Sequence, residues 1–423
     1  MTAEIAILNR QGVALAADSA VSIGTKKVYN SANKLFALSK KHPVGIMIYG
    51  NAQLSGVPWE TIIKYYRANH LKSRSFDRLV DYADDFLDFL QGTELLTPES
   101  ERYFVRSHCH QIATRIRDNI LNNVDKALHK SGPINDSETK RIANEEFKNF
   151  KNGVAKNKTH ESFTKEISSR IKKKYAGDIK EAIADVLEKI PFSPQQLRAI
   201  TDAMIATIGT LKTWDGVSGV VIAGYGEKDI FPVVSELSIE GRVEGFVKVV
   251  RGEGMKIELE NNAAISPFAQ REMVDTFMRG IDPSLFREIH QSLKLILHKM
   301  PDMLKTDHGV NFDAIKMEDI NKTMDNLINN FTDHLVDMQD HYFVRPILQS
   351  VGALPLDELA AMAEALVNLT SFKRKVTMVP ESVGGPIDVA VISKGDGFIW
   401  IKRKHYFAPE LNPDFFERIK ERS

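Results

Sequence analysis

The 423-residue sequence lacks the features that identify several common protein classes. A single cysteine, Cys109, excludes an intrachain disulfide framework and is typical of a reducing compartment. The 56 basic and 56 acidic side chains give a formal net charge of zero, so no general attraction to nucleic acid or membranes is expected. No apolar run is long enough to span a bilayer, and no signal peptide is recognisable. We therefore expect a soluble, cytoplasmic protein with neither a nucleic-acid nor a membrane partner.

Motifs for metals and cofactors are also scarce. His108-Cys109-His110 brings metal-ligand types together, but neighbours on a helix point in different directions and no second ligand pair is in range. The glycine pairs in 224–226 and 252–254 lack the strand-glycine-helix context of a phosphate loop. The lysine-rich stretch 148–174 has few aromatic side chains and is interpreted as a solvated helix face rather than a nucleic-acid patch. We expect no metal and no cofactor.

The sequence does have a threonine at position 2, where removal of Met1 would give it a free α-amine beside its hydroxyl. An N-terminal threonine can be a nucleophile with its own amine as general base. Asp18 follows Thr2 by sixteen residues and Lys34 follows Asp18 by sixteen, and they supply the anion and cation that such a site needs. Each of these residues alone also has a structural explanation. Thr2 is a small residue that permits Met1 removal, Asp18 could belong to a turn, and Lys34 could lie at a strand edge. Together they predict an N-terminal-nucleophile hydrolase.

The surrounding sequence predicts how these residues are positioned. Residues 3–17 contain two short apolar strands around a Gln11-Gly12 turn signal, which is typical of a hairpin that ends next to Asp18. A second strand pair, 34–38 and 44–49, ends at Gly50 before a helical stretch. A glycine at a strand-to-helix junction can aim its N–H at an oxyanion, or it can simply permit the turn. Both interpretations of Gly50 stay open at this point.

These segments resemble a proteasome β-subunit of the bacterial type, an N-terminal-nucleophile hydrolase with, in this chain, large helical insertions. The resemblance rests on Thr2 and on the runs 12–19, 33–36 and 49–52, and it is strong over roughly the first 55 residues. It implies that Thr2, Asp18 and Lys34 are catalytic and that Gly50 stabilises the oxyanion. The residues that it implies for substrate binding are Ser22, Ser19 and Ala52.

The resemblance also implies an aspartate and a serine near the Gly384-Gly385 pair that support the nucleophile. The matching positions carry Pro380 and Val383 instead, which puts proton handling in doubt. An alignment shifted by one or two residues would give the role to a neighbouring side chain. The candidate supporting residues are Glu381, Ser382 and Ser266.

The order of predicted strands and helices is similar to that of the α+β, four-layer αββα sandwich of this family, with enlarged helical layers. We expect one elaborated domain over 1–423, because no flexible linker interrupts the chain. The predicted core covers about 2–55, 212–280 and 355–405, and the helical expansions cover about 56–211 and 281–354. Further strands are expected at 219–224, 231–241, 243–250, 376–380, 386–392 and 397–402.

The resulting functional hypothesis is a threonine-type peptidase or amide hydrolase that uses Thr2 after Met1 removal. Peptides or proteins are the expected substrates. Two alternatives stay open: an amidase of the same class acting on a small molecule, and a non-catalytic assembly or sensor protein that keeps the fold. The resemblance further implies a homo-oligomer, with an ATPase or unfoldase as a candidate partner.

Overall fold

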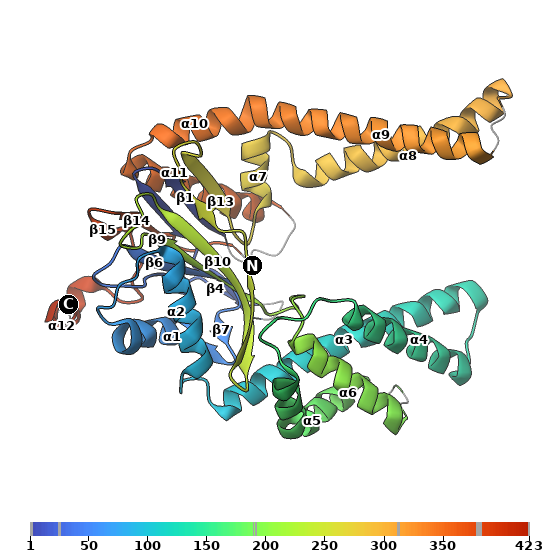
Figure 1. Cartoon of the computed structure of the whole chain (residues 1–423), viewed down its shortest axis with the longest axis horizontal. Helices are drawn as coiled ribbons and strands as arrows, with labels where there is room; N and C mark the ends of the chain where they lie inside the picture. Colours follow the sequence, from blue (N-terminus) through green and yellow to red (C-terminus); the bar gives the residue numbers. More distant parts are fainter. Residues whose placement is uncertain are drawn as a thin grey trace. The chain divides into compact units, whose positions relative to one another are not determined.

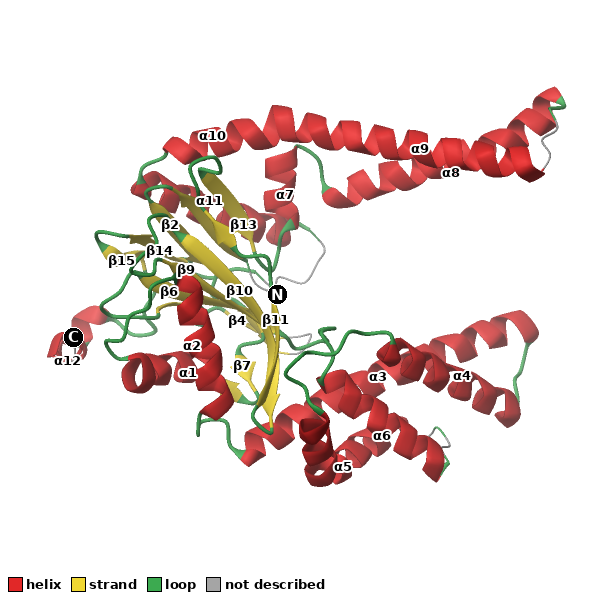
Figure 2. Ribbon diagram, viewed as in Figure 1, coloured by secondary structure: helices red, strands yellow, loops and turns green. Residues whose placement is uncertain are grey.

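The computed structural model describes residues 3–23, 27–188, 190, 193–310, 314–377 and 383–421. The chain divides into two compact units, each with its own sheet and helices (Figures 1 and 2). The first unit comprises residues 1–32, 256–394 and 399–422, and the second comprises 33–255 and 395–398. The single domain with the core and expansions given above stays a prediction.

The first unit is built on a five-stranded sheet in the order β13-β1-β2-β14-β15. The predicted hairpin is confirmed, because β1 and β2 pair antiparallel with Glu4 opposite Ala17, and every residue of both strands is buried. Strands β13 and β14 pair antiparallel with β1 and β2. The strands are β1 (Glu4–Asn9), β2 (Gly12–Ala17), β13 (Ala263–Pro267), β14 (Asp388–Ser393) and β15 (Gly397–Lys402). The sequence analysis did not anticipate the small hairpin of β3 (Val21–Ile23) and β4 (Lys27–Tyr29).

Helices of the first unit cover this sheet and extend away from it (Figure 1). The apolar side of α11 packs on the sheet, with Leu359 and Leu366 in one buried cluster with Ile5 and Val389. Asn9, the last residue of β1, fixes the corner before α11, since its Nδ2 donates to the carbonyl of Leu354 at 2.8 Å. The helices are α7 (Glu272–Arg279), α8 (Pro283–His308), α9 (Ala314–Gln339), the π-helix η2 (Asp340–Val344), α10 (Arg345–Ala353), α11 (Leu356–Val376), the 3₁₀ turn η3 (Pro409–Leu411) and α12 (Pro413–Glu421).

The second unit is built on a sheet in the order β11-β10-β9-β6-β5, in which neighbouring strands pair antiparallel. The strands are β5 (Leu35–Ala37), β6 (Val44–Gly50), β9 (Ser218–Gly224), β10 (Val233–Val243) and β11 (Phe246–Arg251). Three further short strands are β7 (Gln53–Leu54), β8 (Val57–Pro58) and β12 (Met255–Lys256).

Between Trp59 and Ile208 the described residues are helical apart from short connections. Turn and cap residues define the ends: α3 begins at Pro98, where Thr97 accepts a hydrogen bond from the Ser100 N–H, and it ends before Gly132, whose φ is +76°. Helices α1 and α2 pack on the sheet, while α3 to α6 form a second core together with Val243 of β10 and Phe246 of β11. The helices are α1 (Trp59–Tyr65), the π-helix η1 (Tyr66–Leu71), α2 (Leu79–Gly92), α3 (Pro98–Ser131), α4 (Asp136–Ala155), α5 (Lys165–Leu187) and α6 (Pro194–Ile208).

One predicted strand is wrong where the structure describes it. The stretch 376–380 was expected to be extended, but Val376 is the last residue of α11, and residues 378–380 lie outside the described part of the chain. No glycine or proline interrupts 356–376, and Lys373, Arg374 and Lys375 favour a helix C-terminus through the helix dipole. The helix therefore continues to Val376, the first residue of the expected strand.

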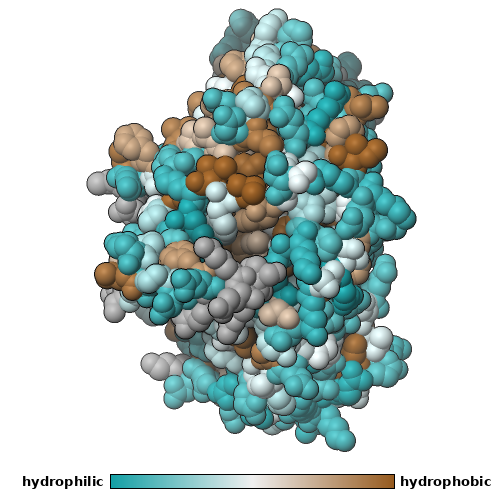
Figure 3. Space-filling model, turned by 90° about the vertical axis from the view of Figure 1, so that its left-hand side faces the viewer, coloured by the Kyte–Doolittle hydropathy of each residue, from teal (hydrophilic) through white to brown (hydrophobic). Residues whose placement is uncertain are grey.

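The structure confirms a mixed chain of helices and antiparallel sheets, and the four-layer sandwich stays a prediction. Within the described ranges, no helix is long and apolar enough to cross a membrane. The face drawn in Figure 3 carries mainly hydrophilic side chains, with hydrophobic ones in small groups.

Candidate functional site

The carboxylate of Asp18 is the best-defined part of the predicted site. Asp18 follows β2 and is 1% exposed. Its Oδ1 accepts from the N–H of Ala3 at 3.1 Å, and its Oδ2 accepts from the N–H of Gly384 at 3.0 Å. The Asp18 N–H in turn donates to the Ala3 carbonyl at 3.1 Å. Asp18 thus joins the residue next to Thr2 to the Gly384-Gly385 segment, which the sequence analysis had singled out.

Three predicted site residues lie outside the described part of the chain: Thr2, Glu381 and Ser382. Ser19 is fully buried, and its hydroxyl donates to the Pro386 carbonyl. Ser266 lies in β13, opposite Ala6 of β1. Ser22 lies in β3, in register with Val28. The roles predicted for all of these residues stay predictions.

Lys34 lies directly before β5 and Gly50 at the end of β6, two neighbouring strands of the second unit's sheet. Lys34 precedes β5 and is 5% exposed, and its carbonyl accepts from the Ile48 N–H at 2.8 Å. Gly50 ends β6, two residues beyond Ile48. The φ of Gly50 is +77°, and a Cβ there would lie 2.5 Å from the Val217 carbonyl oxygen, so a larger residue is excluded on packing grounds alone. The exposed Ala52 follows shortly after.

Comparison with known proteins gives matches among solved structures only. No family model matches the sequence, and no curated protein matches it. Among solved structures, the chain is similar to "Anbu (ancestral beta-subunit) from Yersinia bercovieri", at 8% identity over 99% of this chain and 94% of that one, with a TM-score of 0.27. An Anbu (Gly-1) mutant from Hyphomicrobium sp. strain MC1 matches at 10% identity over 100% and 96%, with a TM-score of 0.27. The helical assembly of the Anbu complex from Pseudomonas aeruginosa matches at 8% over 99% and 94%, with a TM-score of 0.28.

These matches correct the resemblance stated from the sequence. The matched structures are Anbu proteins, a distinct, proteasome-like family, and not bacterial-type proteasome β-subunits. The resemblance rested on short runs within the first 55 residues, and these runs did not identify the family of the matched structures. At these identities and TM-scores, the matches carry no argument about this chain's activity.

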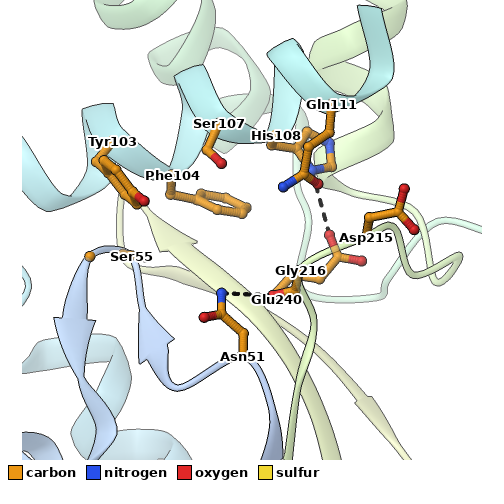
Figure 4. A pocket seen from close by; sticks show the side chains of 11 residues that line it. Asn51, Ser55, Tyr103, Phe104, Ser107, His108, Gln111, Asp215, Gly216 and Glu240 are labelled. Carbon is orange, nitrogen blue, oxygen red and sulfur yellow. Dashed lines mark hydrogen bonds and ion pairs between the residues drawn. The ribbon is translucent and has the colours of Figure 1, made fainter. Parts of the chain in front are cut away.

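The second unit contains a polar pocket, and Asn51, the residue after Gly50, is one of the residues that line it (Figure 4). Asn51 lines it and donates from Nδ2 to the Gly216 carbonyl at 3.1 Å. His108, from α3, lies across from Asn51, and its Nδ1 is 3.5 Å from Oε2 of Glu240, which comes from β10. The sequence analysis did not predict this pocket.

The pocket borders a buried cluster of three ionisable side chains: His108, Glu240 and Lys248. Lys248 Nζ lies 3.0 Å from Glu240 Oε2 and donates to the Thr207 carbonyl at 2.9 Å, and His108 Nε2 lies 2.8 Å from Thr207 Oγ1. Burial raises the pKa of Glu240 and lowers the pKa of Lys248. The available sequence signal was a lysine at 248 inside the apolar run of β11, since a charge there needs a buried partner.

Stability should fall in mild acid because of His108. Burial, followed by the charge of Lys248, holds the pKa of His108 well below 6.5. Below about pH 6.5 the unfolded chain binds a proton that the folded chain does not, so the free energy of unfolding decreases by up to about 1.4 kcal/mol per pH unit. His108→Gln should remove this part of the slope in denaturant titrations between about pH 7.5 and about 5.5. The exposed His129→Gln serves as control, and an unchanged slope in His108→Gln would contradict the assignment.

Proposed function

We propose that this chain is an amide hydrolase whose nucleophile is the hydroxyl of Thr2, exposed at the chain start when Met1 is removed. The observation that carries the proposal is the hydrogen bond from the Ala3 N–H to the buried Asp18 carboxylate, 3.1 Å long. A buried anion beside the N–H of Ala3, the residue after Thr2, supports this proposal. A buried carboxylate is costly unless it is paired, which makes Asp18 suited to holding a cation near the nucleophile.

The proposed reaction has two steps. The Thr2 α-amine takes the hydroxyl proton, and the oxygen bonds to the substrate's carbonyl carbon while Lys34 lowers the cost of the developing alkoxide. The Gly50 N–H stabilises the oxyanion, and the protonated amine returns its proton to the leaving nitrogen as the C–N bond breaks. Water then attacks the ester with the α-amine as base and releases the acid. The roles of Lys34 and Gly50 rest on the sequence.

Peptides are the proposed substrate class, and the αββα sandwich and homo-oligomer expected from the sequence form part of the same proposal. An ATPase or unfoldase partner has no support beyond the sequence resemblance. A small-molecule amidase and a non-catalytic protein are the alternatives. A peptide library with mass-spectrometric readout separates them, because only a peptidase should cleave extended peptides and a non-catalytic protein should cleave nothing.

Lys34→Met tests the proposed cation while keeping an apolar stem of similar length in a 5% exposed position. We expect the rate of amide cleavage to fall by about 10²–10³-fold, because the developing alkoxide would lose its nearby positive charge. The exposed Lys41→Met is the matched control and should keep the wild-type rate. A loss below about threefold, with unchanged melting temperature, would assign the cation to another residue.

A further inference from the structure

Helices α8 and α9 of the first unit run antiparallel as a long hairpin (Figure 1). Two polar contacts set their register: His290 Nδ1 lies 3.0 Å from Thr332 Oγ1, and His298 Nε2 lies 3.0 Å from Asp325 Oδ1. Apolar residues on the facing sides of the two helices form an inner seam, which extends beyond these contacts at both ends. Its described members, buried or half-buried, are Phe286, Leu293, Leu297, Pro301 and Leu304 on α8, and Met324, Ile328 and Leu335 on α9.

A second row of large apolar side chains lies on each helix, each one residue before a member of the inner seam or before His290, Thr332 or Gln339, which continue the helical spacing of the seam. We call these two rows together the outer face. Its side chains are 37–62% exposed, in contrast to Ile328 of the inner seam at 2%. The outer face consists of Leu285, Ile289, Ile296, Met300 and Met303 on α8, and Leu327, Phe331 and Met338 on α9.

Both rows point to the same side of the hairpin. Moving back one residue turns a helix by about 100° around its axis. The inner-seam side chains of α8 and α9 point toward each other. Because the helices are antiparallel, the rotation of about 100° is clockwise in one helix and anticlockwise in the other when both are viewed from the same end. The outer rows of both helices therefore point to the same side of the plane that contains the two axes. The outer face is therefore one continuous apolar surface. Eight large side chains at this exposure amount to several hundred Å², more than a monomer usually leaves without a function.

We propose that the outer face binds the same face of a second copy of this chain, forming a four-helix bundle around a two-fold axis. A helix that contacts one neighbour needs a single apolar seam, whereas a bundle helix contacts two neighbours and carries an additional apolar row beside that seam. Both α8 and α9 have this two-row pattern. A two-fold axis pairs a surface with itself, so one apolar face per chain is sufficient.

The charges of the two helices favour this occupant. Helix α8 carries four basic and three acidic side chains, and α9 carries two basic and five acidic ones. A two-fold arrangement in which α8 of each copy lies beside α9 of the other brings the more basic helix against the more acidic one. An interface of roughly 800 Å² per partner is typical of stable complexes, and the outer face with its polar rim is of that order.

Ile296→Lys and its neighbour Leu295→Lys form a matched pair. Both residues lie on α8 and both are 62% exposed, but only Ile296 belongs to the outer face. We expect Ile296→Lys to weaken self-association at least about tenfold by burying an unpaired ammonium group. Leu295→Lys adds the same charge beyond the interface and should associate like wild type. Sedimentation velocity over a concentration series measures this, with circular dichroism melting to establish that each variant is folded.

Phe331→Lys on α9 should weaken association as Ile296→Lys does, because the interface needs both helices. Three results would overturn the proposal. Wild type could sediment as a single chain at tens of micromolar, which would leave the outer face to a different partner. The two outer-face variants could associate like wild type, which would place the interface elsewhere on the chain. Leu295→Lys could weaken association equally, which would make the effect one of charge alone.

Discussion

Thr2→Ala is expected to abolish amide cleavage while the chain stays folded. Alanine keeps the α-amine and the backbone but removes the only atom that can form the acyl bond in the proposed mechanism. Loss of a covalent nucleophile typically lowers turnover by about 10³-fold or more. The measurement is the initial rate of amine release from a peptide substrate, with removal of Met1 established by mass for each protein.

Thr2→Ser provides the control, since serine also places a hydroxyl beside a free α-amine. It should keep a substantial part of the activity, with a modest loss because the threonine methyl no longer restricts the side chain. Full activity in Thr2→Ala would eliminate Thr2 as the nucleophile. Equal loss in Thr2→Ser and Thr2→Ala would point to a requirement other than the hydroxyl.

Asp18→Ala is expected to destabilise the first unit as well as to abolish the proposed amide cleavage. The carboxylate accepts from the N–H groups of Ala3 and Gly384 at 3.1 and 3.0 Å, and from the N–H of Ala20 at 3.4 Å. An unpaired buried donor costs about 1–3 kcal/mol, so loss of the two shorter bonds should lower the free energy of unfolding by about 2–6 kcal/mol. Denaturant unfolding measures this difference directly.

Asp18→Asn separates the two effects of this substitution. Asparagine keeps the shape of the side chain and one acceptor oxygen. Its NH₂ group, however, faces a backbone N–H that needs an acceptor, and the negative charge is lost. We expect a smaller loss of stability than in Asp18→Ala and a comparable loss of activity. Asp302→Asn, at an exposed position on α8, is the control. Stability of Asp18→Ala within about 0.5 kcal/mol of wild type would contradict the role assigned to the carboxylate.

Turn and cap residues in the sequence predicted the elements whose ends are determined by neighbouring residues. The Gln11-Gly12 turn and its apolar flanks predicted β1 and β2. Helix α3 begins at Pro98 and ends before Gly132, as expected for turn and cap residues. The structure also shows a reason for glycine at position 12 that cannot be seen in the sequence. A Cβ there would lie 2.5 Å from the Ile392 carbonyl oxygen of the neighbouring strand β14, a contact between residues far apart in the chain.

Partners distant in the chain explain what the sequence analysis missed. Glu240 and Lys248 are tolerated in buried strands because they face each other and His108, and no local pattern shows that pairing. The outer face of α8 and α9 was also missed, because helical periodicity alone does not separate a row that packs within the chain from one that stays exposed. For the candidate site, the sequence named Asp18, and the structure supplied its contacts with Ala3 and Gly384.

Intact mass of the purified protein, before and after incubation with a peptidyl epoxyketone, tests the N-terminal nucleophile most directly. This electrophile forms a stable ring only with a hydroxyl and a free amine on the same terminal residue. The account predicts a chain that lacks Met1 and gains one adduct, and Thr2→Ala should gain none. A chain that keeps Met1 and gains no adduct would contradict the account.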